Sequence, residues 1–168
     1  MSIMGDLTFF LGLQVKQLKD GTIISQTKYT RDLIKIFGME EKSSMKIPMN
    51  TSSKMDKDAD GAVDQTRYRA LIGSFIYLTA SRPDITFVVG VCARFQSSPL
   101  DKHWKAVKRI LRYLAGTMQY GLRFTASSSF HLTDFADADW ATDPDDRRST
   151  SGFCVFMGGN LITWSSKK

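Results

Sequence analysis

The sequence predicts an α+β fold in which a β-hairpin comes first, a segment of about four helices follows, and a short, partial antiparallel sheet comes last. Apolar residues alternate with polar ones near the start, recur at helical spacing through the middle, and alternate again after Gly121. Hydrophobic residues make up 42% of the 168 residues, which is enough for one core or two small ones. We therefore expect two domains, residues 1–125 and residues 126–168.

The first element expected is a β-hairpin over residues 8–26. Leu11, Leu13 and Val15 alternate with polar positions, and Asp20-Gly21 supplies a turn before the returning strand. This pattern is typical of a strand with one face toward a core.

A first helix is expected over residues 29–37, with Thr27 as its cap and Gly38 as its stop. Residues 42–62 are rich in Ser, Lys, Asp and Met and show no sustained period, so we expect a mobile loop or linker that is sensitive to proteases.

Three more helices are expected, over residues 64–80, residues 85–95 with Asp84 as N-cap, and residues 101–115. Their apolar faces are predicted from three- and four-residue spacing. The predicted inward residues are Tyr68, Leu71, Ile72, Phe75 and Ile76 on the second helix and Trp104, Val107, Ile110, Leu111 and Leu114 on the fourth.

The period changes to two beyond Gly121, which predicts strands. These strands are expected at residues 122–124, 130–137, 152–157 and 161–164. Asp- and Gly-rich turns join them, as in an antiparallel sheet.

Cys92 and Cys154 lack the spacing of metal ligands, so we expect neither a zinc site nor a disulfide framework. No apolar run is long enough to span a bilayer, and the N-terminus does not resemble a secretion signal. We therefore expect a soluble, intracellular chain that is not secreted and has no membrane partner. Strand-like apolar residues lie close to both ends of the sequence, so we expect that the chain is truncated at both ends.

The net charge of +6 and the pI of about 9.4 favour a polyanionic partner. The basic excess lies within residues 1–125. On the fourth helix Lys105, Arg109 and Arg112 lie at four- and three-residue spacing, a pattern that can follow a phosphate backbone. The alternative is the solvated face of an amphipathic helix.

Residues 134–146 contain six aspartates, and converging carboxylates bind Mg²⁺ because this cation prefers oxygen ligands. Asp137 and Asp139 would point to one face of a strand. The alternative is an acidic turn that Arg147 and Arg148 neutralise.

Six motifs in a fixed order resemble the reverse transcriptase region of copia-type retrotransposons, followed by the start of RNase H. They are residues 9–15 (FFLGLQV), 24–29 (ISQTKY), 68–79 (YRALIGSFIYLT), 81–85 (SRPDI), 103–104 (HW) with 111–117 (LRYLAGT), and 137–141 (DADWA) with 146–152 (DRRSTSG). The resemblance covers nearly the whole chain. The chain also resembles short plant open reading frames that look like remnants of such elements.

The resemblance implies a nucleic-acid-binding role for positions in residues 1–125, the end of the palm and a thumb- or connection-like region. In reverse transcriptases the hairpin after the palm holds the 3′ end of the primer, and the matching residues are Leu11 and Gly12. A glycine allows the backbone to approach a sugar-phosphate chain, although tight packing within the protein is an alternative. The helix that resembles the thumb helix would place Gly73 and Tyr77 at the minor groove of a duplex, and core packing of Tyr77 is the alternative.

Residues 126–168 resemble the first three strands of an RNase H domain, with Asp137 as its first catalytic and metal-binding carboxylate. RNase H uses two Mg²⁺ ions held by three or four acidic ligands, and the segments that carry the others are missing from the sequence. The sequence also has no Tyr-x-Asp-Asp motif for polymerisation. We therefore expect that the chain binds no cofactor as it stands and does not catalyse alone, whereas the parent enzyme uses Mg²⁺.

The resulting hypothesis is a fragment that grips a primer-template duplex, either an RNA–DNA hybrid or a DNA duplex, with the remainder of the Pol polyprotein as its partner in the parent. One alternative is a working RNA-directed DNA polymerase with RNase H that flanking sequence completes. A second alternative is an expressed remnant without function.

Overall fold

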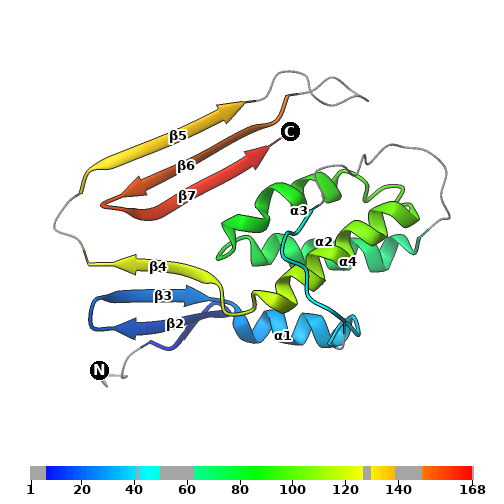
Figure 1. Cartoon of the computed structure of the whole chain (residues 1–168), viewed down its shortest axis with the longest axis horizontal. Coiled ribbons are helices and arrows are strands. Elements are labelled where there is room, and N and C mark those ends of the chain that lie inside the picture. The colour runs from blue at the N-terminus through cyan, green and yellow to red at the C-terminus, as the bar shows by residue number, and fades with distance from the viewer. Residues whose placement is uncertain (1–6, 41, 50–62, 127–129, 139–148, 168) are drawn as a thin grey trace.

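The computed structural model describes residues 7–40, 42–49, 63–126, 130–138 and 149–167 (Figure 1). These residues form four α-helices, one short 3₁₀ helix and two antiparallel sheets, of four and three strands. The predicted α+β class is confirmed. None of the described helices is both long and apolar enough to cross a membrane.

The first sheet has the order β1-β2-β3-β4. Its strands are β1 (Phe9–Phe10), β2 (Leu13–Leu18), β3 (Gly21–Ser25) and β4 (Gly121–Thr125). The predicted hairpin is confirmed as β2 and β3, but Leu11 does not lie on a strand, because Leu11 and Gly12 form the turn between β1 and β2.

Strand β4 joins this sheet by pairing with β3, although the whole helical region separates the two strands in the sequence. The register pairs Gly21 with Thr125 and Ser25 with Gly121. In Figure 1, β4 lies beside β3 at the edge of the sheet that faces the C-terminal strands. The helices are therefore inserted between neighbouring strands of one sheet.

Helix α1 (Thr27–Ile36) ends at a glycine, as predicted. Gly38 has a φ of 63°, its N–H donates to the Lys35 carbonyl, and the Met39 N–H donates to the Ile34 carbonyl, each at 3.0 Å. These two bonds are those of a Schellman motif. The prediction that Thr27 caps the helix is wrong, because Thr27 is its first residue and Gln26 occupies the N-cap position without a side-chain capping bond.

Helix α2 (Gln65–Leu78) begins directly after Asp64, which was predicted as its first residue and is its N-cap, because the Asp64 carboxylate accepts hydrogen bonds from the N–H groups of Thr66 and Arg67 at 2.9 and 3.2 Å. Its buried side chains are Tyr68, Leu71, Ile72, Phe75 and Leu78. Ile76 was expected inside and is 53% exposed, so its prediction as a core residue is wrong.

A 3₁₀ helix η1 (Pro83–Ile85) leads directly into α3 (Thr86–Ala93). The prediction that Asp84 caps this helix is wrong, because the start of α3 has no side-chain cap. The Asp84 carboxylate instead accepts hydrogen bonds from Arg82 and Tyr113.

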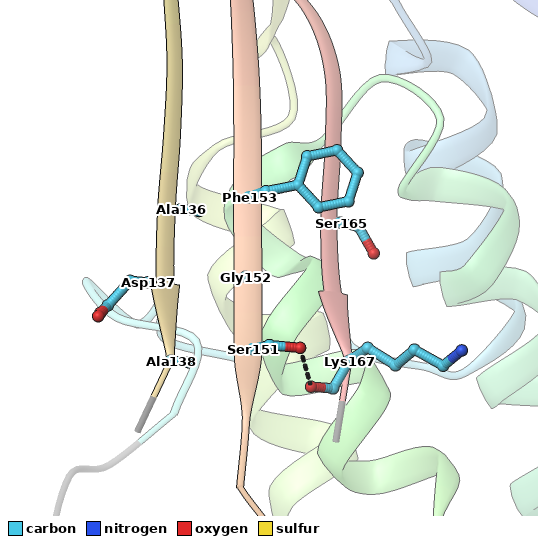
Figure 2. A pocket seen from close by; sticks show the side chains of 8 residues that line it. All are labelled: Ala136, Asp137, Ala138, Ser151, Gly152, Phe153, Ser165 and Lys167. Atoms are coloured by element: carbon cyan, nitrogen blue, oxygen red, sulfur yellow. Dashed lines mark hydrogen bonds between the residues drawn. The ribbon is translucent and has the colours of Figure 1, made fainter. Parts of the chain in front are cut away.

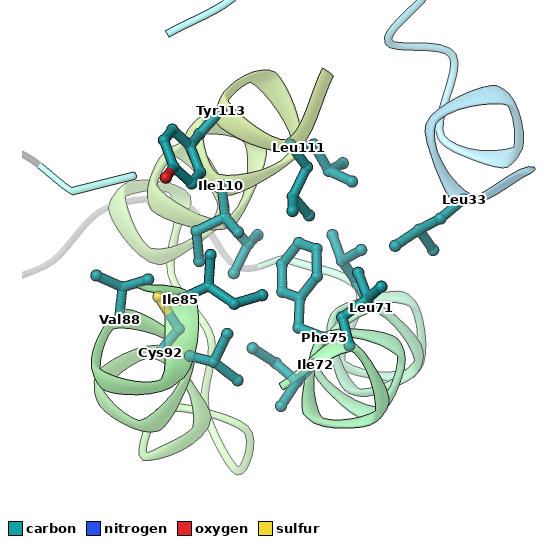
Figure 3. Packing of buried hydrophobic residues seen from close by; sticks show 14 of the residues in the cluster. Leu33, Leu71, Ile72, Phe75, Ile85, Val88, Cys92, Ile110, Leu111 and Tyr113 are labelled. Carbon is teal, nitrogen blue, oxygen red and sulfur yellow. The ribbon is translucent and has the colours of Figure 1, made fainter. Parts of the chain in front are cut away.

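Helix α4 (Asp101–Gly116) begins with a hydrogen bond of 3.0 Å from the Leu100 N–H to Nδ1 of His103. Trp104 is only partly buried, whereas the four other predicted inward residues of this helix are buried. Side chains from all four helices form the main core, in which Phe75, Leu71 and Ile110 lie close together (Figure 3).

The second sheet has the order β5-β6-β7, with β5 (Leu132–Ala138), β6 (Ser151–Met157) and β7 (Asn160–Lys167). Residues of all three strands, together with Pro83 and Phe87, line an apolar hollow of about 560 Å³. The amide side chain of Asn160 joins the two sheets, accepting from the Thr125 N–H at 2.8 Å and donating to the Thr125 carbonyl at 3.0 Å.

Candidate nucleic-acid interface

The turn between β1 and β2 meets the C-terminal part of α2. The Tyr77 hydroxyl donates a hydrogen bond to the Leu11 carbonyl at 2.8 Å. A Cβ atom on Gly12 would lie 2.0 Å from the Tyr77 hydroxyl oxygen, and Gly12 has a φ of 80°, so both packing and backbone require glycine there. The structure thus brings together three of the predicted site residues, and their contact with a nucleic acid stays a prediction.

Tyr77 lies at the surface and not in the core. Its side chain is 37% exposed, and its ring packs edge-to-face on Tyr29 with the ring centroids 4.7 Å apart. Its backbone carbonyl accepts a hydrogen bond of 3.2 Å from the side chain of buried Gln26. The alternative that Tyr77 is a core residue is therefore wrong.

Gly73 lies one helical turn before Tyr77. It is exposed, and a Cβ atom built on it would meet nothing within 4 Å. Because residues three and four apart share one side of a helix, Gly73, Ile76 and Tyr77 form one exposed face of α2. This face is flat at Gly73 and apolar at Ile76.

The basic residues of α4 differ in what they contact. Arg112 donates from Nε to the Ser43 carbonyl at 2.7 Å and from Nη2 to the Ser43 hydroxyl at 2.6 Å. Arg109 donates from Nε to the Ile47 carbonyl at 3.3 Å. The exposed Lys105 forms no hydrogen bond or ion pair with the described residues.

The two arginines hold residues 42–49 along α4. A backbone hydrogen bond of 3.1 Å from the Met45 N–H to the Arg112 carbonyl adds to this attachment. Residues 42–49 form no helix or strand, so the predicted loop is confirmed there, although these contacts attach it to α4, and its mobility stays a prediction; residues 50–62 lie outside the described residues. The attached segment presents Lys42 and Lys46, both exposed, which sequence reasoning missed because the segment has no periodic pattern.

A second basic feature surrounds Trp104. The Arg67 guanidinium lies 5.3 Å from the centre of the Trp104 ring and 5.7 Å from that of Phe37, and the Lys108 ammonium lies 5.4 Å from the Trp104 ring. Cations at this distance interact favourably with aromatic faces. Sequence spacing within α4 could have indicated the Lys108 contact, but not the contact with Arg67 of another helix.

A buried arginine anchors the motif at residues 81–85. Arg82 is 2% exposed and donates to both Asp84 carboxylate oxygens and to the carbonyl and hydroxyl oxygens of Thr117. Burial raises the pKa of Asp84, but hydrogen bonds from Arg82 and Tyr113 and the charge of Arg82 outweigh it, so this pKa lies below its ordinary value. These contacts give Arg82 a structural role between η1 and the end of α4.

Asp137 lies on the edge strand β5, opposite Gly152 of β6, and its side chain is exposed. Asp137 is one of the residues that line a hollow of about 380 Å³, and the described lining, which Figure 2 draws, includes Lys167 and no second carboxylate. Among the described residues no three His, Cys, Asp or Glu side chains lie close enough together to hold a metal ion. Asp137 alone does not fit Mg²⁺, which needs several oxygen ligands, and the predicted neighbour Asp139 lies outside the described residues.

Comparison with known proteins reveals relatives along nearly the whole chain. It is 40% identical over 164 residues to the retrovirus-related Pol polyprotein from transposon RE2 of Arabidopsis thaliana, matching 97% of this chain and 11% of that protein. It is 33% identical over 177 residues to the Pol polyprotein from transposon TNT 1-94 of Nicotiana tabacum, matching 99% of this chain and 13% of that protein. The chain thus corresponds to a small part of these polyproteins.

A shorter relative is matched over most of its own length. The uncharacterized mitochondrial protein AtMg00810 of Arabidopsis thaliana is 34% identical over 168 residues, which are 100% of this chain and 70% of that protein. No family model and no solved structure matches the chain. Its sequence, matched from end to end, shows that this chain belongs to the family of copia-type retrotransposon Pol polyproteins, together with the AtMg00810-type plant mitochondrial proteins.

Proposed function

We propose that this region of a Pol polyprotein grips a primer-template duplex, either an RNA–DNA hybrid or a DNA duplex. One observation carries the proposal: Leu11, Gly12 and Tyr77, which the family resemblance independently assigned to nucleic-acid contact, meet at one place on the surface. They come from segments far apart in the sequence, so spacing alone would not have grouped them.

The exposed face of α2 suits a shallow groove. Gly73 leaves the helix backbone bare, and the partly exposed Tyr77 ring offers a flat surface with one polar group. The minor groove of an A-form-like duplex is wide and shallow and is recognised largely by its shape. The net charge of +6 and the exposed Lys42, Lys46 and Lys105 would add attraction for phosphates.

Two glycine substitutions test the groove contact. A side chain at Gly73 meets open space within the protein, so Gly73→Leu should fold, yet it would stand between α2 and a bound duplex. We expect the affinity of the purified chain for a fluorescently labelled RNA–DNA hybrid, measured by anisotropy, to fall at least about tenfold, which corresponds to about 1.4 kcal/mol. Gly90→Leu on α3 is the matched control, because Gly90 is also exposed and its Cβ would also meet nothing within 4 Å. Equal affinity of the two variants would contradict the proposal.

The dependence of binding affinity on salt concentration tests the contact with phosphates. Affinity for the hybrid should fall log-linearly with salt concentration, and Lys105→Ala should reduce the slope by about one unit, since each phosphate contact releases a counterion. Lys105 suits this test better than Arg109 or Arg112, because those arginines also hold residues 42–49. An unchanged slope would remove Lys105 from the interface.

We also propose that the chain does not catalyse by itself and that Mg²⁺ belongs to the parent enzyme. Support comes from the 168-residue sequence, which contains no Tyr-x-Asp-Asp motif, and from Asp137, the single position that matches a metal-binding carboxylate of RNase H. Purified chain incubated with Mg²⁺ and a labelled hybrid should neither extend the primer nor digest the RNA. RNA digestion that survives Asp137→Asn would point to a contaminant, whereas RNA digestion that this substitution abolishes, or primer extension that co-purifies with the chain, would overturn the proposal.

A further inference from the structure

We infer that Tyr77 is a positioning residue whose hydroxyl holds the turn of Leu11 and Gly12 in the conformation that a nucleic acid meets. This inference rests on the proposed function and deepens it, because it assigns Tyr77 an action through the hairpin in addition to any contact of its own. Four observations carry it: the backbone of the turn, the shortness of β1, the anchoring of Tyr77 and the space at Gly12.

The backbone of the turn is unfavourable for its sequence. Both central residues have a left-handed φ, 48° at Leu11 and 80° at Gly12, as in a type I′ hairpin turn. Glycine accepts this conformation readily because it has no Cβ atom, and asparagine can adopt it through its short polar side chain. Leucine has a Cβ atom and an apolar side chain, so the conformation is unfavourable for it. Something outside the turn must therefore stabilise it.

The hairpin gives the turn little support of its own. Strand β1 contains two residues and pairs with β2 at Phe9 opposite Gln14 and Phe10 opposite Leu13, and one further backbone hydrogen bond of 2.9 Å runs from the Val15 N–H to the Thr8 carbonyl. The Leu11 side chain is 78% exposed, so burial does not fix it. The hydrogen bond of 2.8 Å from the Tyr77 hydroxyl to the Leu11 carbonyl joins the turn to α2.

Tyr77 is itself held firmly. The Ser81 hydroxyl donates to the Gln26 side-chain oxygen at 2.7 Å, and the Gln26 side-chain nitrogen donates to the Tyr77 carbonyl at 3.2 Å. Gln26 and Ser81 are 1% and 0% exposed, so these bonds are shielded from water. Together with the Tyr29 ring, they fix the end of α2 against the junction of β3 and α1. The turn is thus attached to a rigid support.

A hydroxyl deletion tests the inference. In Tyr77→Phe the ring stays, so we expect the thermal unfolding midpoint to change little. We expect amide hydrogen exchange of residues 9–18 to accelerate about fivefold to tenfold, the usual size of one hydrogen bond, and affinity for an RNA–DNA hybrid to fall by a similar factor. Exchange of α2 should stay as in the unmodified chain. Tyr29→Phe is the matched control, because the Tyr29 hydroxyl makes no hydrogen bond with the described residues, and it should change neither quantity.

A second substitution tests the coupling directly. A Cβ on Gly12 would lie 2.0 Å from the Tyr77 hydroxyl oxygen and 3.3 Å from Cζ, so removing the hydroxyl removes the worst overlap. Gly12→Ala should therefore accelerate exchange and weaken binding less in the Tyr77→Phe background than in the unmodified chain. Purely additive effects would contradict a contact between the two positions.

The outcomes separate this inference from the proposed function. If Tyr77→Phe accelerates exchange in residues 9–18 and weakens binding, the inference is supported. If exchange is unchanged, or if exchange accelerates while affinity stays the same, it is overturned. If the unmodified chain binds no hybrid or DNA duplex, the proposed function fails, and the exchange measurement still decides whether the hydroxyl holds the turn.

Discussion

Arg82 donates two hydrogen bonds to the carboxylate of Asp84, at 2.9 Å from Nε and at 2.7 Å from Nη2, across the single residue Pro83. Arg82 is almost completely buried, and its guanidinium lies 5.6 and 5.5 Å from the ring centres of Tyr113 and Tyr120. Two oxygens of Thr117 accept its remaining bonds. The motif at residues 81–85 thus joins η1 to the end of α4.

The first prediction concerns this arginine. Arg82→Lys should lower the free energy of unfolding by about 3 kcal/mol, because lysine cannot reproduce the paired hydrogen bonds and leaves buried acceptors without a donor. Arg123→Lys is the control, since the pair of Arg123 and Asp20 is exposed and should change stability by less than about 1 kcal/mol. Urea denaturation of both variants measures the difference, and equal midpoints would show that the buried network contributes little.

The second prediction concerns pH. Because the pKa of folded Asp84 lies below its ordinary value, the folded state favours the charged carboxylate, and this contribution is fully present above the unfolded value of about 3.9. It is lost as the pH falls through the folded pKa. The stability difference between the unmodified chain and Asp84→Asn should therefore be constant near neutral pH and shrink below about pH 4. A difference that stays constant down to pH 2 would contradict this assignment.

The third prediction concerns the two thiols. Burial raises the pKa of Cys92 to about 12, and the residue is 1% exposed, whereas Cys154 of β6 is half-buried. Since the thiolate is the reactive form, a thiol reagent at pH 8 should label Cys154 in the folded chain and label Cys92 only after denaturation. Mass spectrometry of labelled Cys154→Ser identifies the site. Rapid labelling of that variant under native conditions would show that the helical core opens.

The fourth prediction concerns the segment attached to α4. Arg112→Ala removes both hydrogen bonds to Ser43 and should speed tryptic cleavage after Lys42 and Lys46, because a released segment enters a protease more easily. Lys105→Ala is the control on the same helix and should leave the cleavage rate unchanged. Cleavage that is equally fast in both variants would mean that the backbone contact at Met45 is sufficient.

Local signals in the sequence predicted local structure well. The periodic apolar run from Asp64 predicted α2 close to its observed start, and Gly38 after such a run predicted the end of α1, because helical periodicity and C-terminal capping depend on residues within a few positions. The same reasoning failed at Asp84, since an aspartate before a helix can cap it or pair with an arginine, and nothing in the sequence shows that Arg82 is buried.

Contacts between distant segments could not be predicted. The spacing of Lys105, Arg109 and Arg112 predicted one basic stripe. In the structure the two arginines hydrogen-bond to residues 42–49, which pack along α4, whereas Lys105 does not. The family resemblance named Leu11, Gly12, Gly73 and Tyr77 as site residues, but only three-dimensional proximity shows that a hydroxyl of one binds the carbonyl of another.

The pairing of β3 with β4 has a consequence for how the chain reaches its native state. Closing this ladder requires the two ends of the entire helical segment to come together, which costs loop entropy before any strand contact compensates for it. Local helix packing can form first and bring the ends near each other, whereas the ladder raises the contact order and slows the last step. A gene shortened to end before Gly121 would leave β3 as an uncovered edge, and its product would be prone to self-association.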